Sequence, residues 1–361
     1  VPVTAPDGQR ERSPICPIKN KRGRGLLVGV LEPRLIAPSA PLAACMLPLC
    51  WFAVPAAGVT VVKWGGSAVT KKGEFETLNE PVLDAVAKAI AHSPHEIVVV
   101  HGAGSFGHFQ AKEHGVSAGT TSAKFSWAGF CATRSSVTRL NAFVVQRLNV
   151  AGRSAVGLPS FPRWRTRGGR PCADGTRACV SAVRALLALG MTPVLHGDCV
   201  LDEERGAAVL GGDAVMAALC CSRALRVERA VFLTDVDGVF DRPPDQPGAR
   251  LLPRITVSSS GAVLSYGDES SDIATCSSEH DVTGGIRAKI EEAAAIAARG
   301  VPVCIVRAGT AHAEAALRGE TPAVCTRIER DESARAARGW MRRRRPRARR
   351  VAGTRENVYS E

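Results

Sequence analysis

The sequence contains no Cys-x-x-Cys pair, and its twelve cysteines are not grouped with histidines at the spacing of zinc ligands. Scattered cysteines in a chain of 361 residues are typical of small buried apolar side chains in a reducing compartment. This pattern argues against a zinc-stabilised module and against a disulfide framework. The chain also shows no internal repeat.

Acidic residues are absent between Glu113 and Asp174, and this gap decides how the stretch VVVHGAGSFGH (98–108) is interpreted. Its glycines follow the G-x-G-x-x-G spacing of a dinucleotide-binding turn after an apolar run. Such a turn requires an Asp or Glu about twenty residues further along to bind the ribose hydroxyls. We therefore set NAD aside and interpret the stretch as a loop whose backbone N–H groups converge on another anion at a helix N-terminus.

An uncharged stretch from Leu35 to Val62 lacks the continuous helical character of a membrane span. Prolines interrupt it four times, and its last residues belong to a predicted strand. The preceding leader is basic and poor in acidic residues, as in a cleaved targeting segment. We expect residues 1–57 to be an N-terminal extension, either a targeting segment or disordered. The expected location is the cytoplasm, or an organelle if the extension is a transit peptide, with no membrane association.

The net charge of +13 is concentrated at the two ends of the chain. Residues 1–58 carry seven basic and three acidic side chains, and residues 331–361 carry ten arginines and four acidic side chains. The body between them is nearly balanced. The tail sequence RGWMRRRRPRARR lacks interleaved aromatics apart from Trp340, so we interpret 331–361 as a basic disordered tail. Nucleic acid is not an expected partner.

Strand and helix patterns alternate between residues 58 and 330, which predicts one α/β domain. Short runs rich in β-branched residues predict strands over 59–63, 96–100, 153–158, 191–196, 229–234 and 301–306. Amphipathic spacing predicts helices over 79–92, 124–149, 177–189, 212–224 and 284–299. The alternation predicts a three-layer αβα sandwich with a mostly parallel central sheet. Residues 197–210 are predicted to form a β-hairpin inserted at an edge of that sheet.

Glycine turns, lysines and carboxylates follow the predicted strands, and open α/β sheets bind ligands at the carboxyl ends of their strands. In chain order these residues are Lys63, Gly65, Gly66, Ser67, Lys72, His101, His108, Gly197, Asp198, Gly212, Asp213, Asp235, Asp237, Gly284, Gly285 and Lys289. Three lysines and three glycine turns at one edge indicate a site for several phosphates. Phosphoryl transfer needs such ammonium and N–H groups, because the protein's contribution is to position the phosphates and stabilise their charge.

Six segments, in this order and spacing, resemble the amino acid kinase superfamily and, within it, the isopentenyl phosphate kinases. They are KWGGSAVTKK, HGAGSFGH, HGDCVLD, LGGDAV, LTDVDGVF and DVTGGIRAKI, and the resemblance covers about residues 58–330. It implies ATP-dependent phosphorylation of isopentenyl phosphate to isopentenyl diphosphate, a step of isoprenoid biosynthesis. It also implies Mg²⁺ as a cofactor and a homodimer as the usual assembly.

The resemblance assigns roles to the residues that match the family motifs. The catalytic residues it implies are Lys63, Lys72, His108, Asp213 and Lys289. The ATP-binding residues it implies are Lys63, Gly65, Gly66, Ser67, Gly104, Asp235, Gly284, Gly285 and Lys289. The residues it implies for the acceptor phosphate are Ala103, Gly104, His108 and Gly212. It assigns no protein ligand to a metal.

Alternatives remain open at this stage. The acceptor could be a nucleotide, a phosphonate or an amino acid, the protein could be a non-catalytic nucleotide-binding regulator, or the basic tail could bind RNA. Trp64 stands where the family usually has Leu or Ile, and FPRWRTRGGR (161–170) fits the family poorly, as a variable loop or a sequence error would. We expect His101 to be structural. The acceptor length depends on an apolar pocket for which Phe125, Trp127 and Phe130 are candidates.

Overall fold

The computed structural model describes residues 58–267 and 284–331, without the side chains of residues 284–289. The chain divides into two units, Val1–Leu49 and Cys50–Glu361, and every described residue belongs to the second. The predicted N-terminal extension and all but the first residue of the predicted tail lie outside the described residues. Within the described ranges, no helix is long and apolar enough to cross a membrane.

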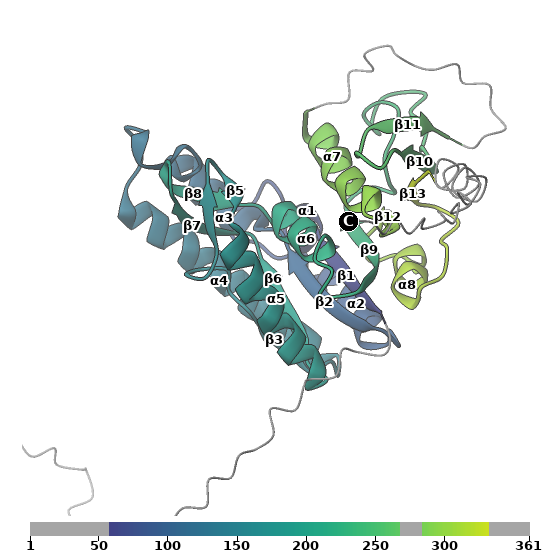
Figure 1. Cartoon of the computed structure of the whole chain (residues 1–361), viewed down its shortest axis with the longest axis horizontal. Helices are drawn as coiled ribbons and strands as arrows, with labels where there is room; N and C mark the ends of the chain where they lie inside the picture. The colour runs from purple at the N-terminus through teal and green to yellow at the C-terminus, as the bar shows by residue number, and fades with distance from the viewer. Residues whose placement is uncertain (1–57, 268–283, 332–361) are drawn as a thin grey trace, which may run out of the picture. The chain divides into compact units, whose positions relative to one another are not determined.

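A nine-stranded sheet forms the centre of the described unit (Figure 1), in the order β11-β10-β13-β12-β9-β1-β2-β6-β3. Its strands are β1 (Val59–Trp64), β2 (Glu96–His101), β3 (Ala155–Gly157), β6 (Thr192–His196), β9 (Val227–Thr234), β10 (Arg254–Val257), β11 (Val263–Tyr266), β12 (Val303–Arg307) and β13 (Thr326–Arg330). Strands β3, β6, β2, β1, β9 and β12 pair in parallel. Antiparallel pairing occurs at β12–β13 and β10–β11.

Helices pack on both faces of this sheet, because its central strands are apolar on both faces. Val61 and Val98 point into one buried cluster, which includes residues of α5, α6 and α7, whereas Val62 and Val99 point into the other, with residues of α2, α4 and α8. The helices are α1 (Gly66–Val69), α2 (Glu80–Ala91), α3 (Gly104–Glu113), α4 (Trp127–Val150), α5 (Ala173–Ala188), α6 (Gly212–Cys220), α7 (Gly284–Ala298) and α8 (Ala311–Arg318), with a 3₁₀ segment η1 (Val116–Thr121). The predicted αβα sandwich with a mostly parallel sheet is confirmed.

The predicted hairpin exists but does not join the edge of the central sheet. Its strands β7 (Asp198–Asp202) and β8 (Gly206–Leu210) belong to a separate four-stranded sheet with β4 (Arg165–Arg167) and β5 (Arg170–Pro171), in the order β5-β4-β7-β8. The edge placement was wrong because β7 pairs with β4, a strand that the sequence pattern did not predict.

The segment 161–170, which fits the family pattern poorly, contains the short strand β4 between turns. In the run RWRTR (163–167), Trp164 and Thr166 are buried while the arginine between them and the two arginines beside them are exposed, so the segment alternates as a strand does. The carboxylate of Asp202 accepts hydrogen bonds from Thr166 Oγ1 at 2.7 Å and from the N–H of Gly169 at 2.7 Å. Asp202 also accepts N–H bonds from Glu204 and Arg205 within the hairpin turn, so one carboxylate connects that turn to β4.

Candidate active site

The carboxyl ends of five parallel strands lie in one row across the sheet. The pairing places Trp64 of β1 opposite His101 of β2, and His101 opposite His196 of β6. On the other side, Trp64 lies opposite Leu233 of β9, which lies opposite Val306 of β12. The segments that follow these strands therefore start at the same level, which is where the sequence predicts the site.

Two glycine turns, one after β1 and one after β2, lie in backbone contact with each other. A Cβ atom on Gly66 would lie 2.6 Å from the N atom of Gly104, and a Cβ atom on Gly102 would lie 2.6 Å from the N atom of Gly66. Gly104 also adopts a φ of 50°, which side chains rarely tolerate. The close approach of the two backbones therefore requires glycine at these positions. The two predicted phosphate-binding turns, 65–66 and 102–104, form one unit, here called the glycine unit.

Helix α3 begins at Gly104, directly in this unit. The N–H of Ser105 donates to Thr70 Oγ1 at 2.9 Å, which joins the first turn of α3 to the end of α1. Its N-cap residue Ala103 supplies no side-chain hydrogen bond to the helix end. A helix N-terminus of this kind attracts anions through its N–H groups and its dipole. His108 lies one turn further along α3 and is exposed.

Lys63 and Asp213, 150 residues apart in the sequence, meet at the end of β1. The Lys63 ammonium forms an ion pair with Asp213 Oδ1, and it lies 5.8 Å from the centroid of the Phe232 ring. Lys63 is buried, and Asp213 is half-buried in the first turn of α6. At the preceding residue, a Cβ atom on Gly212 would lie 3.2 Å from the carbonyl oxygen of His101. The N-terminus of α6 is therefore placed beside the glycine unit.

Two buried histidines support the strand ends. The rings of His101 and His196 stack with centroids 5.4 Å apart, and Asn141 Nδ2 lies 3.1 Å from His101 Nε2. Burial lowers the pKa of His101 to about 3, and the neighbouring His196 adds to this shift. Burial also lowers the pKa of His196. Both rings are therefore neutral near neutral pH, in agreement with the structural role expected of His101.

Lys72 is not part of the Lys63–Asp213 contact. It is exposed on the loop between α1 and α2, and no hydrogen bond or ion pair joins it to another described residue. The loop contacts α3, since the N–H of Thr77 donates to Ser105 Oγ at 3.3 Å. Of the two predicted lysines whose side chains the structure describes, Lys63 pairs with Asp213, and Lys72 lies on a loop that packs against α3.

The two aspartates after β9 have different surroundings. Asp237 pairs with Arg307 at the end of β12, with Oδ1 2.8 Å from Arg307 Nε. This hydrogen bond holds the pKa of the Asp237 carboxyl below its usual range. Asp235 is exposed. The partner of Asp237 was not predicted, because an arginine ending a strand carries no motif of its own.

The structure describes three predicted residues only as part of a helix. Gly284, Gly285 and Lys289 belong to α7, and the Lys289 side chain lies outside the described part of the chain. Ser67 is half-buried in α1. Across residues 58–267 and 290–331, no three His, Cys, Asp or Glu side chains gather in a way that could hold a metal ion.

Comparison with known proteins gives one consistent family. The model of the "Amino acid kinase family" matches residues 58–307. An isopentenyl phosphate kinase of Arabidopsis thaliana is 37% identical over 307 residues, covering 72% of this chain and 90% of the relative. One from Methanothermobacter thermautotrophicus is 35% identical over 269 residues, covering 72% and 95%. A solved structure titled as isopentenyl phosphate kinase superposes with a TM-score of 0.60 at 31% identity, covering 75% of this chain and all of that one.

Proposed function

Since the chain belongs to the amino acid kinase family, we propose that it is a kinase that transfers the γ-phosphoryl group of ATP to isopentenyl phosphate, forming isopentenyl diphosphate and ADP. One observation carries this proposal. The two glycine turns lie in backbone contact with each other, and the ion pair of buried Lys63 with half-buried Asp213 lies beside them. Fixed N–H groups and a fixed ammonium group are suited to a phosphoryl group whose charge is spread over three oxygens.

The nucleotide side of the site centres on the end of β1. Lys63, oriented by Asp213, contacts the ATP phosphates and the transferred group in this proposal. Lys72 stabilises the transition state from its loop, and Lys289 contributes from α7. The remaining nucleotide contacts follow the family resemblance and comprise Gly65, Gly66, Ser67, Gly104, Asp235, Gly284 and Gly285.

The acceptor phosphate binds at the N-terminus of α3. Ala103 and Gly104 offer N–H groups there, His108 binds the acceptor phosphate from the next turn, and Gly212 borders it from α6. A phosphate monoester is largely ionised near neutral pH, because its second pKa is about 6. The reaction therefore needs no side-chain base, and the task of these groups is to hold two anions in line.

The acceptor tail has an apolar region available on the same helix. Ala111 of α3 belongs to a buried cluster with Val116, Phe130, Cys199 and Ala207. Phe125 and Phe161 pack against this cluster, and Trp127 lies in edge-to-face contact with Phe125, with ring centroids 5.1 Å apart. We place the isoprenoid tail toward this cluster, so its aromatic residues set the acceptor length.

Mg²⁺ would enter with the nucleotide. Mg²⁺ that binds with a nucleotide is held mainly by phosphate oxygens and water. When bound, the ion neutralises charge between donor and acceptor phosphates.

The remaining assignments complete the proposal. Residues 58–330 form the kinase domain, preceded by an N-terminal extension (1–57) and followed by a basic tail (331–361). The protein forms a homodimer, as the family resemblance implies, and acts in the cytoplasm or, with a transit peptide at its N-terminus, in an organelle.

A coupled ADP-release assay tests the proposed reaction. We expect turnover with isopentenyl phosphate, and the assay includes dimethylallyl phosphate and geranyl phosphate to measure the acceptor length. Glutamate, UMP and fosfomycin serve as acceptors of the other kinases in the superfamily. Turnover with one of these three in place of isopentenyl phosphate would reassign the substrate, and ATP binding without any turnover would indicate a regulator.

A further inference from the structure

Residues 71–78, here called the strap, connect α1 to α2 and carry Lys72. The strap is closed on itself, since the N–H of Lys71 donates to the carbonyl oxygen of Thr77 at 3.0 Å. It is also joined to the first turn of α3 by the Thr77–Ser105 hydrogen bond. Its position therefore sets where the Lys72 backbone lies relative to the helix that begins at the glycine unit.

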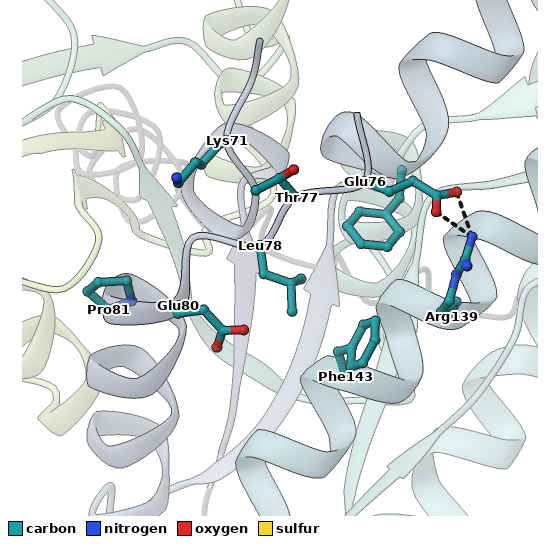
Figure 2. A pocket seen from close by; sticks show the side chains of 9 residues that line it. Lys71, Glu76, Thr77, Leu78, Glu80, Pro81, Arg139 and Phe143 are labelled. Atoms are coloured by element: carbon teal, nitrogen blue, oxygen red, sulfur yellow. Dashed lines mark hydrogen bonds and ion pairs between the residues drawn. The ribbon is translucent and has the colours of Figure 1, made fainter. Parts of the chain in front are cut away.

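Glu76 attaches the strap to two helices at once, and Figure 2 shows its contact with Arg139 of α4. Its Oε1 atom accepts hydrogen bonds from Gln110 Nε2 of α3 at 2.9 Å and from Ser136 Oγ of α4 at 2.6 Å. Arg139 of α4 donates from Nη2 to both carboxylate oxygens, at 2.6 and 2.5 Å. The Glu76 side chain is only 16% exposed, which shields its carboxylate from water, whereas the Arg139 side chain is 54% exposed.

The backbone of Glu76 adopts a φ of 47°, in the left-handed region that disfavours residues with a side chain. Such a conformation persists only where the surroundings enforce it. A glycine would satisfy the turn without strain, but it could not make the contacts to Gln110, Ser136 and Arg139. The side chain is therefore what this position requires.

Apolar packing of the strap on the α4 side leaves a hollow beside Leu78. The strap borders a cavity of about 670 Å³, lined by residues that include Leu78 of the strap, Phe106 of α3, and Arg139 and Phe143 of α4. On the α3 side, Phe75 packs edge-to-face on Phe109 with ring centroids 5.8 Å apart, but the Phe75 side chain remains exposed. On the α4 side, the hydrogen bonds of the strap among the described residues are thus those of the Glu76 carboxylate, and Leu78 packs against the apolar cluster that includes Leu140 of α4.

We propose that Glu76 is a positioning residue for phosphoryl transfer. By attaching the strap to α3 and α4, it fixes the position of the Lys72 backbone relative to the N-terminus of α3. The Lys72 ammonium group therefore has fewer accessible positions. This inference rests on the proposed function, in which Lys72 stabilises the transition state. Glu76 touches no substrate in this account and acts only through the strap.

The test combines variants at residue 76 with a control on the same loop. Glu76→Ala removes every side-chain bond, Glu76→Gln keeps an acceptor oxygen but loses the charge, and Glu76→Gly also relieves the backbone strain. Glu74→Ala is the matched control, since Glu74 carries the same charge on the strap but pairs only with Lys71, at 3.5 Å, with its side chain 55% exposed. The variants are assayed with isopentenyl phosphate and ATP, alone and combined with Lys72→Ala.

We expect Glu76→Ala and Glu76→Gly to lower kcat at least tenfold, with KM for ATP changed less than twofold. Glu76→Gln should fall between them and the wild type, and Glu74→Ala should stay within twofold. In the Lys72→Ala background, Glu76→Ala should lower kcat by less than a further twofold. The effects of the two substitutions are not additive, because Glu76 acts through Lys72. Equal losses in both backgrounds, full activity of Glu76→Gly, or an equal effect of Glu74→Ala would overturn the inference.

Hydrogen exchange of the Lys71 and Thr77 amides provides a readout that does not depend on turnover. Glu76→Ala should exchange at least tenfold faster than Glu74→Ala at these amides, and equal exchange would overturn the inference. If the wild type turns over isopentenyl phosphate and Lys72→Ala lowers kcat strongly, but Glu76→Ala has the kcat of the wild type, only the role of Glu76 is refuted. A wild type without turnover on isopentenyl phosphate would refute the proposed function, and the exchange comparison would still decide whether Glu76 anchors the strap.

Discussion

The most informative single change is the removal of the carboxylate that pairs with Lys63. In Asp213→Ala the Lys63 ammonium stays buried, with the Phe232 ring 5.8 Å away as its remaining favourable neighbour among the described residues. Removing one partner of a buried ion pair costs about 3–5 kcal/mol, because the other charge is left uncompensated. The Asp213 side chain is 29% exposed, so water can reach part of the vacated space. We therefore expect a loss of about 2–3 kcal/mol in the free energy of unfolding.

This loss has a measurable thermal consequence. For a domain of this size, 1 kcal/mol shifts Tm by roughly 2–4 °C, so Asp213→Ala should lower Tm by roughly 4–12 °C. Asp213→Asn keeps the volume and one acceptor oxygen, and it should lose about half as much. The control is Asp237→Asn, which breaks an ion pair with Arg307 in which both side chains are at least a third exposed. Exposed pairs contribute about 0–1 kcal/mol, so its Tm should change by less than roughly 4 °C.

The catalytic consequence is separate from the thermal one. Loss of one preorganised group raises the barrier by about 3–4 kcal/mol, which lowers turnover roughly 100- to 1,000-fold at a temperature where the variant is folded. Thermal unfolding by circular dichroism and the ADP-release assay at 25 °C measure the two effects on the same sample. An Asp213→Ala variant that unfolds within 1 °C of the wild type and keeps its turnover would refute the role of the pair.

Three further changes test other parts of the site. Gly66→Ala places a Cβ atom 2.6 Å from the N atom of Gly104 and should lower kcat/KM at least about 100-fold, whereas Gly73→Ala, with no atom within 4 Å of its Cβ, should retain activity. Lys72→Ala should lower kcat by about two orders of magnitude with little change in ATP affinity, and an unchanged kcat would remove Lys72 from the mechanism. Burial alone would raise the pKa of the Asp202 carboxyl, but hydrogen bonds from Gly169, Thr166 and the hairpin turn bring it well below its usual range. The stability it contributes is complete above the unfolded pKa of about 3.9 and is lost as pH falls below that value, so urea unfolding between pH 5 and 2.5 should show a weaker pH dependence in Asp202→Asn.

The central strands could be predicted from the sequence because burial on both faces leaves a continuous apolar run. VTVVK and EIVVV have this character, and the predicted ranges agree with β1 and β2 within one residue. Helix α3 was not predicted as an element, since its first residues, GSFGH, have the composition of a loop. The helix forms because Gly104 can adopt a positive φ and Thr70 accepts the Ser105 N–H, and neither condition is visible in a local pattern.

The parts of the site that depend on distant partners escaped prediction for a related reason. Glu76 lies in a polar loop segment, and its partners Ser136 and Arg139 follow 60 and 63 residues later. No spacing rule connects residues that meet only after α3 and α4 have packed. The Lys63–Asp213 pair is just as distant, but each residue lies in a motif next to a glycine turn, and the family resemblance supplied the connection.

Helix α3 links the two functions that the site must combine. Its first turn contacts the β1 turn through Gly104 and Thr70, and its later residue Gln110 contacts the strap through Glu76. The neutral rings of His101 and His196 add no charge at the strand ends, so in the proposed function the field at the phosphates depends on the lysines and on the N–H groups of the turns. In that proposal, a displacement of α3 would move both the acceptor phosphate and the strap that carries Lys72. Because α3 sets the positions of both the acceptor phosphate and the strap in this proposal, the geometry of phosphoryl transfer depends on the packing of α3 against the glycine unit. It depends less on any single surface residue.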